Sequence, residues 1–466
     1  MIKSRLIRLY LSLDKSALRQ LKNWINSPVH NQHLKSTELF DFLFTRKKIN
    51  KTTVDKKRCF KYLYGQENYD EKKINILMSY CFKILTEFIG YLSTENEKYF
   101  MQNLTIKYLS NRNMPKIAAS ILCKSEASIN AQPLQNAQES LWRYQIEKER
   151  LRLSSNKTRT EHTTLEPLFR HLNNFYVISM LKHACLAASQ HNMSQQEYKI
   201  DLLQEVLQQA TQNKHPVVQL YLNSYQTLST SNNTVYYENT AKQFIQHNEY
   251  LDKEEKREIL LILINYSIKK LNTGADKFRR KAFDWYKWGL DNHLLIKEQH
   301  LSRFAYSNIA SLGLQLKEFE WVADFIPKYA KVLEEKHRDN YIHYTRAKLY
   351  FNQKKYARTQ QLLLQIEYED IFLNLDAKTM LLEIYYEERS YDALEALLQS
   401  FSRYLQRKSV MAYHKEVYKN IIFLIRKMLD IAPYDKKAIE KLKQQVENTQ
   451  PLAERHWLLQ QIELLT

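Results

Sequence analysis

The chain has 466 residues, a formal net charge of +19, and only five glycines and eight prolines. Average glycine usage is about 7%, and no two glycines of this chain lie closer than 15 positions. The Walker A phosphate loop, the dinucleotide-binding fingerprint and the nucleophile elbow need closely spaced glycines, so these three motifs are excluded. Scarce glycine also predicts an all-α chain that seldom needs a positive φ angle.

The positive charge is concentrated in the first two-fifths of the chain. Residues 1–200 contain 32 Lys and Arg against 17 Asp and Glu, whereas residues 201–400 contain 26 against 27. Such asymmetry predicts an acidic partner, which would be a nucleic acid, an acidic protein or an anionic surface. A basic surface that is merely solvated has the same composition, so both interpretations stay open.

The N-terminal residues combine positive charge with apolar side chains, as a signal peptide does. Arg5 and Arg8 interrupt the apolar run and no small-residue cleavage site follows, so an amphipathic first helix is the better interpretation. No apolar stretch approaches the roughly 18 residues of a membrane span. Four widely spaced cysteines predict reduced thiols and a cytoplasmic location. They are Cys59, Cys81, Cys123 and Cys185.

Helical periodicity dominates residues 1–95, which we interpret as a compact basic N-terminal domain. A helix is expected after Asp14, whose carboxylate suits an N-cap because it can accept from the free amides of the first turn. Further helices are expected over Leu34–Phe44, before Gly65 as a C-terminal residue, and from Asp70 onward.

A basic run within this domain mixes cations with aromatic rings. That mixture suits phosphate contact and base stacking, although any basic amphipathic helix produces it. The candidate partner-binding residues are Arg46, Lys47, Lys48, Lys56, Lys57, Arg58 and Lys61.

Residues 96–275 read as an irregular array of helical hairpins. Prolines stand near expected helix starts, where a missing N–H is tolerated. They are Pro115, Pro133, Pro167 and Pro216. The polar segment Leu151–Thr164 is the best candidate for a loop or a break, and Ser229–Thr234 marks a turn. No Asn-Gly or Asp-Gly signal of a β-hairpin occurs anywhere.

The C-terminal half contains an internal repeat. Residues 346–365 align with 381–400 at an offset of 35, and Tyr356 then matches Tyr391. Residues 312–326 fit the same frame, with Phe319 at the Tyr356 position and an offset of 37. A period near 34 residues is that of the tetratricopeptide repeat, in which helical hairpins stack to bury their apolar faces.

Residues 280–430 therefore resemble a degenerate tetratricopeptide-type array. The stretches WYKWGLDN, AKLYFNQKKYARTQQLLLQ and LLEIYYE, with SLDKSALRQLKNWINSP near the N-terminus, also resemble an uncharacterised family of large helical proteins from bacteria. This resemblance implies no activity. The small residue expected three positions after each aromatic is replaced by Thr359 and Leu394, so groove residues of the standard repeat are not transferred.

Two of the glycines in this half are expected to end helices. They are Gly274 and Gly289. Gly313 lies inside a predicted hairpin helix, where glycine costs about 1 kcal/mol relative to alanine. Close helix packing would explain its presence.

Candidate catalytic and metal-binding groups are sparse. His30 and His33 are three positions apart beside a proline turn, and a metal site would need a further ligand. His183 sits among apolar residues and is expected to be a satisfied core or boundary histidine. Clustered acids are expected to solvate the surface or favour a helix N-terminus. They are Glu367, Glu369, Asp370, Glu387 and Glu388.

Aromatic residues are abundant, with 32 tyrosines and six tryptophans. Trp285, Tyr286 and Trp288 are expected to fill a seam between hairpins, with a binding groove as the alternative.

The sequence predicts a helical-hairpin, tetratricopeptide-like solenoid with a small N-terminal helical domain. Four parts are expected: the basic domain 1–95, the irregular array 96–275, the repeats 276–430 and capping helices 431–466. We expect a cytoplasmic, non-catalytic adaptor or regulatory scaffold that binds a protein or peptide, with no metal, no cofactor and no membrane span. A nucleic-acid or ribonucleoprotein-binding protein is the alternative, and an enzyme with a helical active site is a third class.

Overall fold

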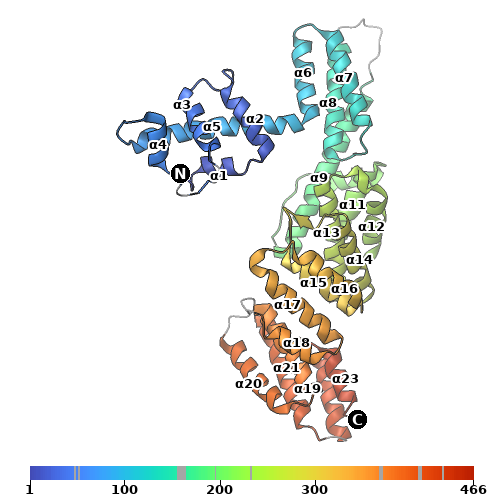
Figure 1. Ribbon diagram of the computed structural model, residues 1–466. Coiled ribbons are helices and arrows are strands. Elements are labelled where there is room, and N and C mark those ends of the chain that lie inside the picture. The colour runs from blue at the N-terminus through green and yellow to red at the C-terminus, as the bar shows by residue number, and fades with distance from the viewer. Residues whose placement is uncertain are drawn as a thin grey trace. The chain divides into compact units, whose positions relative to one another are not determined.

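The computed structural model describes residues 1–466 except 47–48, 51–52, 155–163, 195, 231–232, 367–370, 408–411, 433–434 and 466. Over the described residues, regular structure consists of 23 α-helices, one short 3-10 helix and one two-stranded hairpin (Figure 1). The prediction of an all-α chain is therefore confirmed.

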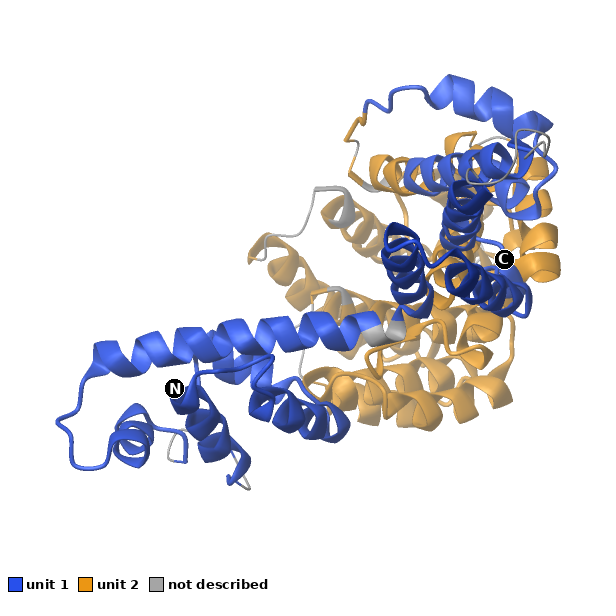
Figure 2. Cartoon of the chain, turned by 90° about the horizontal axis from the view of Figure 1, so that it is seen from above, with its two compact units in different colours: residues 1–184, 199–222, 249–251 blue, residues 185–198, 223–248, 252–466 orange. Residues whose placement is uncertain are grey.

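The chain divides into two compact units (Figure 2). Unit 1 contains residues 1–184, 199–222 and 249–251, and unit 2 contains residues 185–198, 223–248 and 252–466. The division into four parts expected from the sequence stays a prediction beside this two-unit division.

Unit 1 begins with five helices that share one apolar core. They are α1 (Arg5–Leu11), α2 (Lys15–Asn26), α3 (Leu34–Phe44), α4 (Lys56–Tyr64) and α5 (Glu71–Asn96). The Asp14 carboxylate accepts from the Ala17 amide at 2.7 Å, which confirms the expected N-cap of α2. Gly65 follows α4 with a φ of 64°, as expected for a helix C-terminal residue.

The long helix α5 packs against each of α1 to α4. Its buried side chains include Ile84, Leu85 and Phe88. Over Glu71–Thr94 it is long and apolar enough to cross a membrane by length and composition alone. The sequence expectation missed this stretch because charged residues such as Lys83 interrupt its apolar run. Within this helix, 33% of the apolar window is buried, and some of its apolar side chains, such as Ile76, are exposed.

The remainder of unit 1 is also helical. Its elements are α6 (Lys98–Asn111), α7 (Pro115–Asn130), α8 (Ala137–Ser154), α10 (Leu203–Gln212) and parts of α9 (Glu166–Ser194) and α11 (Pro216–Ser229). Pro115 and Pro216 are the first residues of their helices, as predicted, because the N-terminal position of a helix needs no N–H donor. Most of the predicted loop Leu151–Thr164 lies outside the described residues.

Unit 2 continues with helical pairs. Its first elements are α12 (Thr234–His247), α13 (Lys253–Asn272), α14 (Lys277–Asp291), β1 (Ile296–Lys297) and β2 (His300–Leu301), and the 3-10 turn η1 (Asn248–Tyr250) lies at the boundary of the units. The hairpin pairs Ile296 with Leu301. Its turn residues, Glu298 and Gln299, have φ angles of 50° and 65°. This hairpin carries no sequence signal because Glu-Gln occupies positions where Asn-Gly is usual.

The helices that follow carry the repeat. They are α15 (Arg303–Gln315), α16 (Phe319–Ala330), α17 (Glu335–Asn352), α18 (Tyr356–Leu363), α19 (Ile371–Glu387), α20 (Tyr391–Arg407), α21 (Ala412–Asp430), α22 (Lys436–Asn448) and α23 (Arg455–Glu463). Phe319, Tyr356 and Tyr391 each begin the second helix of a pair, at the predicted offsets. Helix α17 contacts α15 and α19 as well as its own partner α18.

The turn between the two helices has the same geometry in three pairs. Lys317, Lys354 and Arg389 have φ angles of 62°, 57° and 56°. The following residue donates its amide to a carbonyl five positions earlier, as from Lys355 to Tyr350 at 2.8 Å. Positive φ angles are few among the described residues, as expected, but most of them fall on residues other than glycine. Non-glycine residues occupy these left-handed positions, at a cost of about 1–2 kcal/mol each, and the turn satisfies helix-end carbonyls.

The two glycines near the first repeat have packing roles. A Cβ atom on Gly313 would stand 2.6 Å from Val322 Cγ2, so close packing of α15 on α16 explains the absent side chain. Gly289 lies inside α14 rather than ending it, which corrects the prediction. Its added Cβ would stand 2.6 Å from Leu260 Cδ2.

Candidate functional site

The predicted basic site centres on α4, which has one core face and one solvent face. Cys59, Phe60 and Leu63 are buried in the N-terminal core. Lys57, Arg58 and Lys61 are exposed, and we call these three the α4 basic face. Lys57 and Lys61 are one helical turn apart, so both side chains leave the helix on the same side.

The other predicted cations are placed differently. Lys47 and Lys48 lie outside the described residues. The Arg46 guanidinium lies 4.3 Å from the centre of the Phe42 ring. Lys56 pairs with Glu71 at 2.6 Å, and this hydrogen bond raises the pKa of the Lys56 ammonium. Lys56 therefore joins α4 to α5, and its charge is already compensated.

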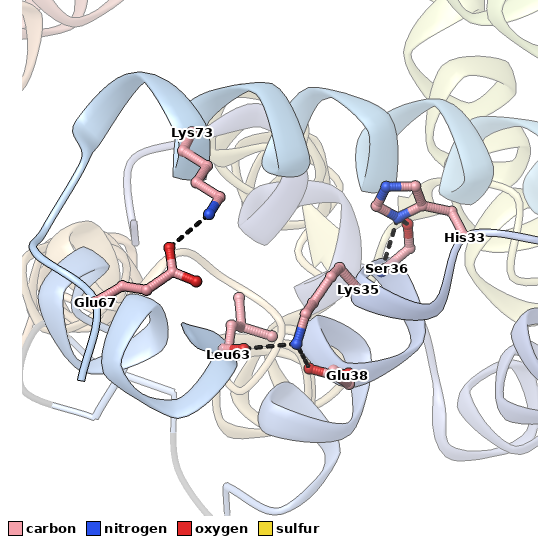
Figure 3. A network of polar contacts seen from close by, with 7 residues as sticks. All are labelled: His33, Lys35, Ser36, Glu38, Leu63, Glu67 and Lys73. Carbon is pink, nitrogen blue, oxygen red and sulfur yellow. Dashed lines mark hydrogen bonds and ion pairs between the residues drawn. The ribbon is translucent and has the colours of Figure 1, made fainter. Parts of the chain in front are cut away.

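Further lysines beside α4 hold the N-terminal helices together (Figure 3). Lys35 Nζ donates to Glu38 and to the Leu63 carbonyl oxygen, both at 2.7 Å, which ties α3 to the end of α4. Lys73 of α5 pairs with Glu67 at 2.6 Å. Lys35, Lys56 and Lys73 are therefore each paired with an acid, whereas the cations of the α4 basic face are exposed to solvent.

The two N-terminal histidines each contact a residue near the end of a helix. The His30 ring stacks on Trp24 with their centres 3.5 Å apart, while His33 Nδ1 lies 2.8 Å from Ser36 Oγ at the start of α3. His183 is exposed rather than set in the core, and its Nδ1 lies 2.7 Å from the Ser179 carbonyl oxygen. No group of three His, Cys, Asp or Glu able to hold a metal ion occurs among the described residues.

The tryptophan-rich segment of α14 fills a seam, as predicted. Trp285 Nε1 donates to Tyr237 Oη at 3.0 Å, and Tyr237 Oη lies 2.9 Å from Ser267 Oγ. Trp288 packs edge-on against Phe244, with ring centres 5.0 Å apart. These contacts join α12, α13 and α14 through buried polar edges.

Unit 2 contains an acidic site that sequence reasoning missed. The charges of three other carboxyl groups raise the pKa of Glu383, and we call these four groups the inner carboxyl cluster: Asp376, Glu383, Glu387 and Glu454. Glu387 was expected to solvate the surface; instead it accepts from Trp457 Nε1 at 3.0 Å and from the Tyr356 hydroxyl. Glu388 is exposed, as expected for an acid at a turn. The other predicted acids, Glu367, Glu369 and Asp370, lie outside the described residues.

Asp376 is anchored by a lysine from the preceding pair. Lys348 Nζ lies 3.0 Å from Asp376 Oδ2 and 3.4 Å from Ser311 Oγ. The Tyr344 hydroxyl also donates to Asp376. Burial by itself would raise the pKa of Asp376. The Lys348 ammonium and the hydrogen bonds lower the pKa by a larger amount, so the net pKa lies below its ordinary value. Asp376 is therefore a stably ionised, fully compensated group.

Glu383 differs from Asp376, because no cation is among the groups that shift its pKa. The Glu383 residue is only 7% exposed, and neither its carboxyl nor that of Glu454 makes a side-chain hydrogen bond or ion pair within the described part of the chain. Burial, followed by the charges of Glu454, Glu387 and Asp376, raises the pKa of Glu383 to about 9. Burial and the Asp376 charge also raise the pKa of Glu454, while the Lys348 ammonium lowers it in part. Perturbed carboxyls of this kind are a recognised mark of functional sites.

The repeat offsets place polar groups at one matching position of three successive helices. Ser311, Lys348 and Glu383 occupy the same repeat position on α15, α17 and α19, at the offsets of 37 and 35 residues. Phe304 lies two turns before Ser311 on the same side of α15, and it is 62% exposed. We call Phe304, Ser311, Lys348, Asp376 and Glu383 the first-helix face. The repeat offset was the signal that could have found it.

Comparison of the chain with protein-family models, curated proteins and solved structures finds no match. The resemblance to a helical family of bacteria stays a prediction, and the function is argued from the geometry.

Proposed function

We propose that the protein is a non-catalytic cytoplasmic adaptor or scaffold that binds a protein segment on the first-helix face of a tetratricopeptide-like stack. The observation that carries the proposal is the stacking of three helical pairs with the same turn geometry, with polar groups at matching positions on their first helices. Such stacks offer extended surfaces for a polypeptide. Exposed Phe304 supplies an apolar anchor beside the charged positions.

Phe304→Glu tests this proposal. Phe304 is 62% exposed, so the substitution leaves the core unchanged, and Val235→Glu on α12 is a matched control because Val235 is 58% exposed. Proteins crosslinked to the native chain in lysate are identified by mass spectrometry, with and without nuclease. A partner crosslinked at α15, α17 or α19, lost in Phe304→Glu and kept in Val235→Glu, supports the proposal. Equal retention by both variants contradicts it.

The α4 basic face favours nucleic-acid binding as a second candidate. Its exposed cations lie beside the half-exposed Tyr62, a pairing of phosphate and base contacts used for single strands. Reversing Lys57 and Lys61 together removes two phosphate contacts, so the slope of log K against log salt falls by about 1.4 to 1.8. Lys15→Glu with Lys22→Glu on α2 makes the same charge change at exposed lysines elsewhere. Oligonucleotide binding that responds equally to both pairs, or to neither, rules out α4 as the site.

A further inference from the structure

Helix α6 of unit 1 has two apolar faces, and only one of them is buried in the fold. On the buried face, Tyr99 and Ile106 pack into a core shared with α7 and α8 (Figure 1). The other face carries four large side chains that are each between 42% and 59% exposed. We call them the outer face of α6: Phe100, Met101, Leu104 and Tyr108. At 3.6 residues per turn, all four lie within an arc of about 100°.

Cations stand at both edges of this arc. Lys107 lies beside Phe100 on the helical wheel, about 20° outside the arc. At the other edge, the Arg112 guanidinium lies 5.1 Å from the centre of the Tyr108 ring. Neither cation forms an ion pair with an acid of the described chain. The outer face is therefore an apolar stripe with a positive charge on each side.

The segment that contains this face has no acidic residue. Residues 98–125 include five cations and no Asp or Glu. The cations are Lys98, Lys107, Arg112, Lys116 and Lys124. The turn after α6 extends the apolar surface, since Met114 and Ile117 are exposed there and the Met114 amide donates to the Leu109 carbonyl oxygen at 3.0 Å. An apolar surface in a positive field calls for an anionic occupant that also has an apolar part.

We propose that the outer face of α6 binds the surface of a membrane that contains anionic lipids. A helix that lies in the membrane interface places its apolar side chains at the boundary of the acyl chains, while flanking lysine and arginine reach the lipid phosphates. Phe100, Leu104 and Tyr108 enter that boundary along about 12 Å of one side of the helix. Lys107 and Arg112 contact the phosphates. Helix α6 stays packed on α7 and α8, because the contact uses exposed side chains.

Three other occupants fit this surface less well. A second copy of the chain would bring its own cations against Lys107 and Arg112, which is unfavourable. A single-stranded nucleic acid stacks its bases on aromatic rings, whereas Met101 and Leu104 offer none. A partner helix usually docks into a groove, and the outer face is the convex side of a single helix. Lipid supplies both the negative charge and an apolar layer that adapts to a convex stripe.

The experiment is cosedimentation of the full chain with vesicles of phosphatidylserine and phosphatidylcholine in equal parts, and with vesicles of phosphatidylcholine alone. We expect binding to the mixed vesicles that weakens with salt, and none to vesicles without the anionic lipid. Phe100→Ser with Leu104→Ser should weaken binding by at least about tenfold. Phe169→Ser with Leu172→Ser changes the same residue types at exposed positions of α9, and this matched control should bind as the wild type does.

A second pair of variants tests the charge. Lys107→Gln with Arg112→Gln should weaken binding by roughly 25-fold, since each cation near an anionic membrane contributes about a factor of five. Lys57→Gln with Lys61→Gln removes the same charge from the α4 basic face, and it should weaken binding by less than about fivefold because screening limits distant charges.

Equal binding to phosphatidylcholine alone, equal losses in the α6 and α9 pairs, or a response to the α4 pair as large as that to Lys107 and Arg112 would overturn the proposal. Crosslinking of an acidic protein to α6 without any binding to the mixed vesicles would also reject it. The substituted apolar side chains are exposed, so their variants should fold, and circular dichroism checks this. The vesicle test involves no protein partner, so its outcome is independent of the proposed adaptor function.

Discussion

Replacing Glu383 with glutamine removes an ionisable group from the inner carboxyl cluster while keeping almost the same size. The ordinary pKa of this carboxyl is 4.5, and burial with neighbouring carboxylates raises it to about 9. Between these values the folded chain binds a proton that the unfolded chain releases, so the free energy of unfolding falls as pH rises. Below the lower value both states are neutral, and above the higher value the penalty is constant.

The size of the effect follows from that window. Each pH unit costs about 1.4 kcal/mol, so at pH 7 the wild type loses about 3 kcal/mol relative to pH 4.5 through this group. Glutamine cannot ionise, and the variant should not show this loss. We therefore expect Glu383→Gln to be more stable than the wild type by about 1–3 kcal/mol at pH 7. This range allows for the cost of a buried amide that is incompletely hydrogen-bonded.

Urea unfolding of unit 2 at pH 5, 7 and 9, followed by tryptophan fluorescence, measures the difference. The gap between variant and wild type should widen from pH 5 to pH 9. Glu395→Gln should follow the wild type at every pH because Glu395 is exposed. A variant destabilised by the same amount at all three values would refute the reasoning, since it would show that the carboxyl is compensated in the folded chain.

Two predictions concern the backbone of the repeats, and urea midpoints measure both. Gly313→Ala places a Cβ 2.6 Å from Val322 Cγ2, so overpacking of about 1–3 kcal/mol should outweigh a helix-propensity gain of about 1 kcal/mol. Gly90→Ala meets no atom within 4 Å and should stabilise by up to about 1 kcal/mol; the same sign for both would contradict the packing argument. Lys354→Gly removes a side chain at a φ of 57° and should gain about 0.5–1 kcal/mol, whereas a loss would show that the lysine stem packs in the turn.

The helices of residues 1–95 could be predicted because their signals are local. Periodicity placed Leu34–Phe44, and the Asp14 cap depends only on the three residues that follow it. The repeat offsets likewise placed the starts of α18 and α20, since each pair buries the same face. Composition does not report that helix-end turns of this chain place lysine and arginine at positive φ, so these turn positions could not be predicted.

The inner carboxyl cluster could not be predicted from local patterns. Glu454 comes 71 positions after Glu383, and their proximity depends on how the segment before α23 packs onto the pairs. Glu387 was expected to be a solvated acid at a turn, because the residue that donates to it, Trp457, is 70 positions away in the sequence. Non-local packing of this kind carries no periodic signal.

Neighbouring repeat positions differ in their chemistry. Leu312, Leu349 and Ile384 share one repeat position and are all buried, so this position forms the seam between pairs. The position just before it holds Ser311, Lys348 and Glu383. This position holds a hydroxyl, then a cation and then an acid, so it stays polar while its chemistry changes. At the buried Glu383, an apolar residue would stabilise the fold more than a glutamate without a partner. A seam needs uniform apolar residues, whereas a surface that reads a particular segment needs different groups along its length, so this position is where the specificity of the proposed adaptor should reside.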